Sequence, residues 1–290
     1  MIPMRALLLA AAGLWGAVWG SFFNVAIARF PWEEETVVRP GSHCRACKAP
    51  IAWYDNLPIV SWLLLRGKCR RCGARFSVVY ALIEAFSAAL CVALMHRFAP
   101  AAAELAALEP QEVTLRVLPA LMLFAFAGGL IVAGVIDLKT QLLPDIITMP
   151  GIVLGFYASW WIGTPGMKQS AIGAALGGGV VLLLHYGWKL LRGFEGMGLG
   201  DAKLLAMIGA WLGPAAVMFA LFAGSLQGIL GWLVARRRLE EASSDEEKER
   251  RPTQVPIAFG PFLALAALEW LVLGDRILAW LELFLGGGAV

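Results

Sequence analysis

The sequence predicts an all-α polytopic membrane protein with one small cysteine-rich module outside the bilayer. Of its 290 residues, 59% are hydrophobic and 16% charged, whereas soluble domains average about 45–50% apolar and about 25% charged residues. Apolar segments of about 20 residues, enough to cross the hydrocarbon core of a bilayer, recur along the chain. Four of the five cysteines lie in the polar stretch between the first two such segments. The net charge of +3 is too small to indicate nucleic acid as a partner.

The apolar pattern predicts about eight transmembrane helices, of which the sixth is partial or tilted because Gly213-Pro214 turns the chain sharply. The expected spans are 4–28, 78–98, 117–137, 146–163, 170–191, 203–213, 214–235 and 257–284. The first is longer than the apolar part of a usual signal peptide, so we expect a retained span.

Basic residues predict the orientation. They gather in the loops after the first and seventh spans, which are therefore expected on the cytoplasmic side, with both termini outside. The expected organisation is a first transmembrane helix at 1–29, a cytoplasmic zinc-ribbon-like module at 30–77, and a transmembrane core at 78–290. Within the core, 236–255 forms a charged linker with too few apolar residues to bury a core of its own.

The cysteines form two Cys-x-x-Cys pairs separated by 21 residues, a spacing typical of structural zinc sites. They are Cys44, Cys47, Cys69 and Cys72. Four thiolates complete a tetrahedral zinc site, and the metal stabilises a module too small to fold by packing alone. The alternative is two disulfides or reactive thiols, which a cytoplasmic location disfavours. His43 is not expected to be a ligand, and Cys91, alone in the second span, is expected to be a small core residue.

Two aspartates are candidates for chemistry. Asp137 ends the third span and Asp201 opens the sixth, so the expected topology places both at the same membrane face. Two close carboxylates share a proton and can work as the general acid and base of an aspartic protease. The alternatives are that Asp201 caps its helix and that Asp137 pairs with Lys139 or Lys203. Two further classes stay open: a proton- or cation-coupled transporter using the two aspartates, and a zinc-bearing assembly scaffold without catalysis.

The segment before Asp201 is rich in glycine. Gly196, Gly198 and Gly200 leave backbone uncovered, so an extended substrate can approach closely, and Lys203 follows on the same segment. Other carboxylates that could reach the site are Glu84, Glu195 and Asp145, of which Asp145 is expected to cap the fourth span.

Together these motifs resemble the bifunctional type IV prepilin peptidases, intramembrane aspartyl proteases with a Gly-x-Gly-Asp signature, over nearly the whole chain. The resemblance rests on Gly20-Ser21-Phe22-Phe23-Asn24-Val25 with Arg29 and Pro31, the cysteine module with 53–58 and 61–63, Asp137 with Leu143-Pro144-Asp145, 198–201 with Lys203, and Phe259-Gly260-Pro261-Phe262. It departs from the family pattern at Val79, Ala81 and Phe194.

The resemblance implies a bacterial inner-membrane enzyme with Asp137 and Asp201 as the catalytic pair. Its implied substrates are type IV prepilins and type II secretion pseudopilins, whose short basic leader ends in Gly before an apolar helix. It also implies N-methylation of the new N-terminus by S-adenosylmethionine. The cofactor region it indicates combines the cysteine module with Asn24 and Tyr80–Glu84. Acidic groups that could guide the basic leader are Glu33, Glu34 and Glu35.

Overall fold

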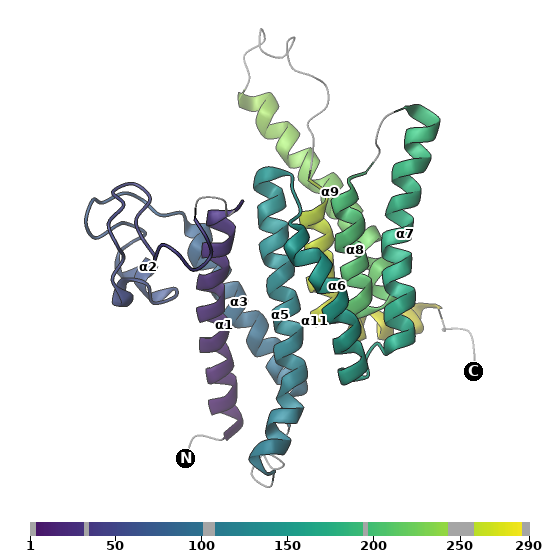
Figure 1. The fold of residues 1–290 in the computed structure, drawn as a ribbon, viewed down its shortest axis with the longest axis horizontal. Coiled ribbons are helices and arrows are strands. Elements are labelled where there is room, and N and C mark those ends of the chain that lie inside the picture. The colour runs from purple at the N-terminus through teal and green to yellow at the C-terminus, as the bar shows by residue number, and fades with distance from the viewer. Residues whose placement is uncertain (1–3, 32–34, 101–107, 194–196, 243–257, 286–290) are drawn as a thin grey trace. The chain divides into compact units, whose positions relative to one another are not determined.

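The computed structural model describes residues 4–31, 35–100, 108–193, 197–242 and 258–285. Every expected span coincides with a helix (Figure 1). These helices are α1 (Met4–Arg29), α3 (Val78–Phe98), α5 (Pro110–Thr140), α6 (Asp145–Ile162), α7 (Met167–Arg192), α8 (Leu199–Leu212), α9 (Pro214–Ala242) and α11 (Gly260–Leu285). Two short helices, η1 (Trp53–Asp55) and α2 (Val60–Leu64), lie in the cysteine module. The all-α fold class is confirmed.

Six helices in the described part of the chain are long and apolar enough to cross a membrane, where eight spans were expected. They are α1, α3, α6 and α7, together with Gln111–Thr140 and Pro214–Val234. The other two differ for separate reasons. With 14 residues, α8 is short, and α11 carries Glu269, Asp275 and Arg276 in its middle.

The chain forms two compact units, residues 1–132 and 133–290, with α5 contributing to both. Within the first unit α1 packs along α3, so the first and second expected spans lie together. Of the expected charged linker, 236–242 continues α9, and 243–255 lies outside the described residues.

Helices α1 and α3 of the first unit touch backbone to backbone. A Cβ on Gly16 would lie 2.7 Å from the Cβ of Cys91, and one on Gly20 would lie 2.7 Å from the Cα of Glu84. Only glycine fits at these points, and the four-residue spacing matches the small-residue motif of closely packed membrane helices. Cys91 is 1% exposed against this contact, which confirms it as a core residue.

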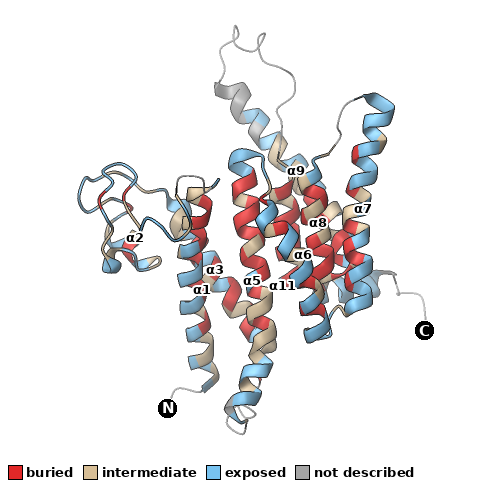
Figure 2. Ribbon diagram, in the orientation of Figure 1, coloured by how far each residue is buried: buried red, intermediate tan, exposed pale blue. Residues whose placement is uncertain are grey.

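Helix α8 is the core of the second unit, with α6, α7, α9 and α11 all packed against it. Figure 2 shows buried residues along most of its length. Trp211 of α8 donates its indole N–H to the carbonyl of Gly151 in α6 at 2.8 Å. Since other helices enclose α8, it presents little surface to lipid, and this enclosure explains how so short a helix can serve within a membrane bundle.

Candidate active site and metal centre

Asp137 lies in the last turn of α5 and is 5% exposed. Its carboxylate accepts a hydrogen bond from the backbone N–H of Gly260, the first residue of α11. A Cβ on Gly260 would lie 2.5 Å from Asp137 Oδ2, so only a glycine allows this approach. The start of a helix favours a negative charge, and α11 therefore both orients and stabilises the Asp137 carboxylate.

Asp201 lies in the first turn of α8 and is 9% exposed. Its carboxylate accepts the N–H of Gly198, the residue at the N-cap of α8, while its own N–H donates to the Gly198 carbonyl at 3.2 Å. This reciprocal pair resembles a capping box. The Asp201 side chain therefore satisfies a backbone N–H at the start of α8, in line with the alternative that it caps this helix. The same bonds fix the direction of its carboxylate.

The two carboxylates lie close enough for their charges to repel each other. Leu143 lies next to a glycine beside each aspartate, Gly200 and Gly260. A Cβ on Gly200 would lie 3.1 Å from the Leu143 Cβ, and one on Gly260 would lie 3.2 Å from Leu143 Cδ1. Gly200 is thus covered by Leu143. A carboxylate pair of this kind, buried and held by backbone donors, is suited to share one proton.

Asp145 is not the N-cap that the sequence predicted. Helix α6 begins at Asp145 itself, and its N-cap is Pro144, which makes no side-chain cap. The Asp145 carboxylate instead pairs with the Lys203 ammonium at 2.7 and 2.8 Å. Lys203, at the start of α8, therefore pairs with Asp145 and not with Asp137, which was one of the alternatives.

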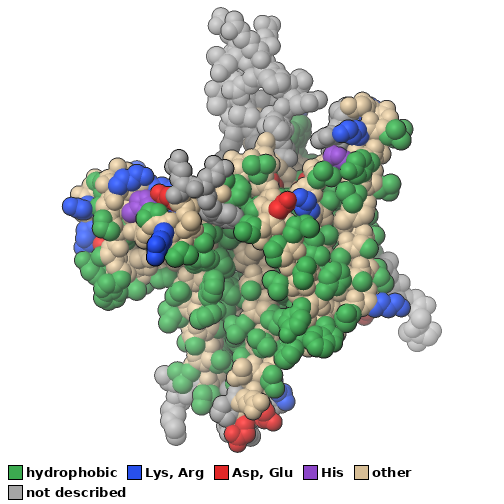
Figure 3. Space-filling model, in the orientation of Figure 1, with side chains coloured by type: hydrophobic (Ala, Val, Ile, Leu, Met, Phe, Trp, Pro, Cys, Tyr) green, Lys and Arg blue, Asp and Glu red, His purple; other side chains and the backbone are tan. Residues whose placement is uncertain are grey.

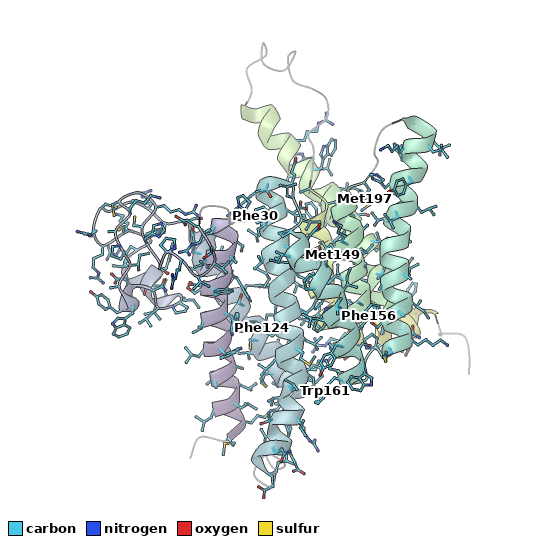
Figure 4. The ribbon with its side chains drawn as sticks, in the orientation of Figure 1. Phe30, Phe124, Met149, Phe156, Trp161 and Met197 are labelled. Atoms are coloured by element: carbon cyan, nitrogen blue, oxygen red, sulfur yellow. The ribbon has the colours of Figure 1, made fainter. Side chains whose placement is uncertain are left out.

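The glycine segment is described only from residue 197 onward, so Gly196 and Glu195 lie outside the described residues. Met197, labelled in Figure 4, accepts a hydrogen bond through its carbonyl from His185 Nδ1 of α7 at 2.6 Å. The His185 ring is 3% exposed. This buried bond ties the segment before Asp201 to α7.

The four cysteines lie on two knuckles with the same backbone hydrogen bonds. In the first knuckle the Cys44 N–H donates to the Ala49 carbonyl at 2.9 Å, and in the second the Cys69 N–H donates to the Ala74 carbonyl at 2.8 Å. The flanking bridges, His43 with Pro50 and Lys68 with Arg75, also correspond. Residues 42–51 and 67–76 therefore form a structural repeat, and the shared pattern Cys-Arg-x-Cys-x-Ala is its signal in the sequence.

The knuckles bring the four sulfur atoms within 4.8 Å of one another, with Cys44 Sγ and Cys72 Sγ 3.8 Å apart. Zinc–sulfur bonds of about 2.3 Å in a tetrahedron separate the sulfurs by about 3.8 Å, so the arrangement fits a zinc ion. A hydrogen bond from the Cys47 N–H lowers the pKa of the Cys44 thiol to about 6, which favours the thiolate that a metal requires. His43 lies beside Glu35, at 3.5 Å, and is not part of the cluster.

A cavity of about 620 Å³ lies between the cysteine module and the helices α1 and α3. Asn24 of α1 donates to the Tyr80 carbonyl of α3 at 2.9 Å, and Glu84 accepts the N–H of Ile59 at 2.7 Å. Asn24, Tyr80 and Glu84, named by the sequence as a possible cofactor region, all line this cavity. Its size is in the range of small-molecule sites.

One ion pair braces the module beside this cavity. Arg70 donates two parallel hydrogen bonds to the Asp55 carboxylate, at 2.7 and 2.8 Å, and lowers the pKa of that carboxyl. The Arg70 guanidinium also lies 5.7 Å from the centre of the Tyr54 ring. The wall of the cavity on the module side is therefore positioned by charge and ring contacts as well as by the knuckles.

The fold and these sites define a helical, multi-pass membrane protein with a buried carboxylate pair and a separate four-thiolate module. Two family models match the chain: the bacterial peptidase A24 N-terminal domain over residues 14–98, and the type IV leader peptidase family over residues 123–233.

Full-length relatives agree with these matches. A prepilin leader peptidase/N-methyltransferase of Myxococcus xanthus is 32% identical over 98% of this chain and 96% of its own length. Proteins of the same name from Aeromonas hydrophila, 35% identical over 90% and 89% of the two chains, and Burkholderia pseudomallei, 32% over 96% and 88%, also match. The chain therefore belongs to the type IV leader peptidase family. No solved structure matches it significantly.

Proposed function

We propose that the chain is an intramembrane aspartyl endopeptidase that removes the short basic leader from type IV prepilins and type II secretion pseudopilins. The observation that carries this proposal is the meeting of Asp137 and Asp201, both buried and each bonded to a backbone N–H at a helix start. The names of the relatives, all prepilin leader peptidase/N-methyltransferase, support the substrate class.

The pair supplies both proton transfers that peptide hydrolysis needs. The ionised carboxylate takes a proton from a water molecule, whose oxygen attacks the scissile carbonyl carbon. The protonated partner donates to the carbonyl oxygen as negative charge develops there. The leaving nitrogen then receives a proton from the pair, the C–N bond breaks, and one shared proton remains.

The substrate enters from the bilayer. A pilin-like helix would lie in lipid beside the bundle, with its leader junction at the ends of α5 and α8, where the dyad lies. By the positive-inside rule, the basic loops that follow α1 and α9 support a cytoplasmic location for this face. Glu35, one of the acidic groups expected to guide the leader, pairs with Arg29 and His43, whereas Glu33 and Glu34 lie outside the described residues.

We further propose that the cavity beside the cysteine module binds S-adenosylmethionine for methylation of the new N-terminus. The cofactor supplies an electrophilic methyl group, and the acceptor amine must be neutral to attack it. Glu84 accepts hydrogen bonds from the Ile59 N–H and the Ser21 hydroxyl, and a carboxylate so positioned can take the proton of the amine. The four cysteines would hold zinc and so fix the wall of this cavity.

The dyad is tested with Asp137→Asn and Asp201→Asn in the purified full-length protein, using a synthetic prepilin and mass spectrometry. Each variant is expected to lose cleavage by about 10³-fold or more. Glu269→Gln is the matched control, because Gln227 holds that carboxylate of the same unit at 2.8 and 2.9 Å. Full cleavage by either aspartate variant would reject the dyad.

The methyl-transfer proposal needs a separate test, with a peptide that already lacks its leader. Glu84→Gln is expected to bind S-adenosylmethionine in calorimetry but to transfer little methyl, whereas Asn24→Ala is expected to weaken binding, because the tie between α1 and α3 at the cavity is lost. Both should still cleave prepilin. Unchanged binding and transfer in both variants would show that S-adenosylmethionine does not bind in this cavity.

A further inference from the structure

The cysteine module carries an exposed apolar surface that neither proposed reaction uses. Val60, Leu63 and Leu64 occupy one face of α2, since residues three and four apart share a helix face. They are 49%, 61% and 76% exposed. Trp53, 78% exposed, and Leu57, 44% exposed, precede them on the same segment. We refer to these five residues as the apolar face.

The opposite side of α2 is different. Ser61, Trp62 and Leu65 line the cavity, and Ser61 is buried, with its hydroxyl donating to the Tyr54 carbonyl at 3.0 Å. The helix is thus fixed with its polar contacts inward and its large aliphatic side chains outward. Water would be a poor medium for so many adjacent exposed apolar side chains.

A hydrogen bond sets the depth of α2 along the neighbouring spans. Ile59, at the N-cap of α2, donates its N–H to Glu84 Oε2 at 2.7 Å. Glu84 lies six residues beyond the start of α3 at Val78, which is about 9 Å along the helix axis. Because α3 is a candidate span, α2 begins level with the second turn of a membrane helix.

The charged side chains of the module lie away from its apolar edge. Figure 3 shows hydrophobic side chains along the edge of the module that lies toward the N-terminal half of α1, and Lys and Arg side chains toward the opposite edge. The basic residues of the module come both before and after α2: Arg39, Arg45, Lys48, Arg66, Lys68, Arg70, Arg71 and Arg75. An apolar side bordered by cations is the pattern of a segment lying in the headgroup region of a bilayer.

We propose that α2 is an interfacial membrane anchor, and that the apolar face of the module contacts the lipid bilayer rather than water or another protein. Interfacial helices bury their apolar side about 5–10 Å into the boundary between headgroups and acyl chains, and the bond between Ile59 and Glu84 holds α2 beside the second turn of a candidate span. Trp53 suits the same zone, where aromatic rings gather. The anchor requires neither catalytic assignment, because it rests on the first unit alone.

The test places the photoreactive residue p-benzoylphenylalanine at position 64, and separately at 63, in the full-length protein reconstituted in phosphatidylcholine vesicles with and without phosphatidylglycerol. Position 38 is the matched control. Val38 is 75% exposed, like Leu64, but its loop lies beyond the end of α1, where Thr36 accepts a bond from Arg29 at 2.7 Å. Position 14, in the lipid-exposed part of α1, is the positive control.

Phospholipid adducts, weighed by mass spectrometry after irradiation, are expected at positions 63 and 64 at nearly the yield of position 14 and several-fold above position 38. Equal, low yields at 64 and 38 would show a face in water and overturn the anchor. Adducts to a second copy of the chain would overturn it in favour of a dimer surface.

A second measurement uses the unsubstituted protein, so no introduced side chain can disturb the apolar face. Hydroxyl-radical labelling in the same vesicles should modify Trp53, Leu63 and Leu64 less than their exposure in the structure predicts, while Val38 is modified in full. If the labelling of all four side chains, corrected for intrinsic reactivity, followed their exposed fractions in the structure, the proposal would be contradicted.

Discussion

In the 133–290 unit, the aspartates lie where helices meet across glycines, whereas in the 1–132 unit four sulfur atoms are held by two loops with little regular structure. Asp137 and Asp201 owe their positions to the starts of α11 and α8. The thiolates owe theirs to backbone bonds within ten-residue knuckles. One site is set by long-range packing, and the other by local turns whose four sulfur atoms fit a zinc ion.

Because the two sites are held in different ways, substitutions in one unit should impair only the reaction proposed for that unit. A side chain added at a glycine contact in the second unit should disturb cleavage and leave the knuckles intact. Loss of a thiolate should disturb the cavity beside the module and leave the dyad in place.

Among the variants that compare the two units, the largest effect is expected for Gly260→Ala. Its added Cβ would lie 2.5 Å from Asp137 Oδ2, so the carboxylate or the start of α11 must shift. A displacement of about 1 Å at a catalytic group can cost about 10²-fold in rate. Leader cleavage, followed by mass spectrometry, should fall by about this factor, while methylation of a precut peptide stays at the wild-type rate.

Gly187→Ala is the matched control for Gly260→Ala. Gly187 lies inside α7, and a Cβ added there would meet no atom of another element within 4 Å. Alanine at this position should stabilise the helix by about 0.5–1 kcal/mol. Normal cleavage by Gly260→Ala would show that α11 does not hold Asp137 for the reaction.

Next in size is the loss of a thiolate. Cys69→Ser should reduce the zinc content of the purified protein, measured by atomic emission, from about one ion per chain to nearly none. Methyl transfer should be lost because the module forms one wall of the cavity, while leader cleavage should remain. Cys91→Ser serves as the control, since Cys91 lies in α3 outside the cluster. Full methyl transfer by a zinc-free variant would show that the cavity does not depend on the metal.

Much of this contrast could be predicted from the sequence, because it depends on local patterns. Apolar length located the helices, and the second expected span, 78–98, has the bounds of α3 itself. Costly charges at helix ends singled out Asp137 and Asp201, and cysteine spacing singled out the metal cluster.

What the sequence did not show depends on tertiary contact. Gly260 is one of 32 glycines, and nothing local marks it as the partner of Asp137. The pairing of Asp145 with Lys203 joins the starts of two helices that are far apart in the chain. The exposed face of α2 is not predictable from the sequence, because five residues are too few to show an amphipathic pattern. The knuckle repeat, in contrast, was readable in the pattern Cys-Arg-x-Cys-x-Ala.

A smaller effect is expected from acid. The pKa of the Cys44 thiol is lowered from the ordinary value of 9.0 to about 6, whereas that of the Cys72 thiol is raised to about 11, so in the metal-free module one thiol favours the thiolate and the other opposes it. Protons also compete with zinc for the thiolates. Zinc release to a chromogenic chelator should therefore accelerate as the pH falls from about 8 to about 5. A release rate that does not change with pH would contradict thiolate ligation.

The smallest effect compares the two knuckles with each other. Each has a residue in the left-handed conformation after its second cysteine: Lys48 with φ +56° and Gly73 with φ +71°. A non-glycine residue bears a cost of about 1–2 kcal/mol in that region, so Lys48→Gly should stabilise the first knuckle and Gly73→Lys should destabilise the second. Chelator-induced zinc loss should become slower in the first variant and faster in the second, while Gly41→Ala, in open space, should change neither. Faster zinc loss from Lys48→Gly together with slower loss from Gly73→Lys would mean that side-chain charge, rather than backbone conformation, controls the knuckles.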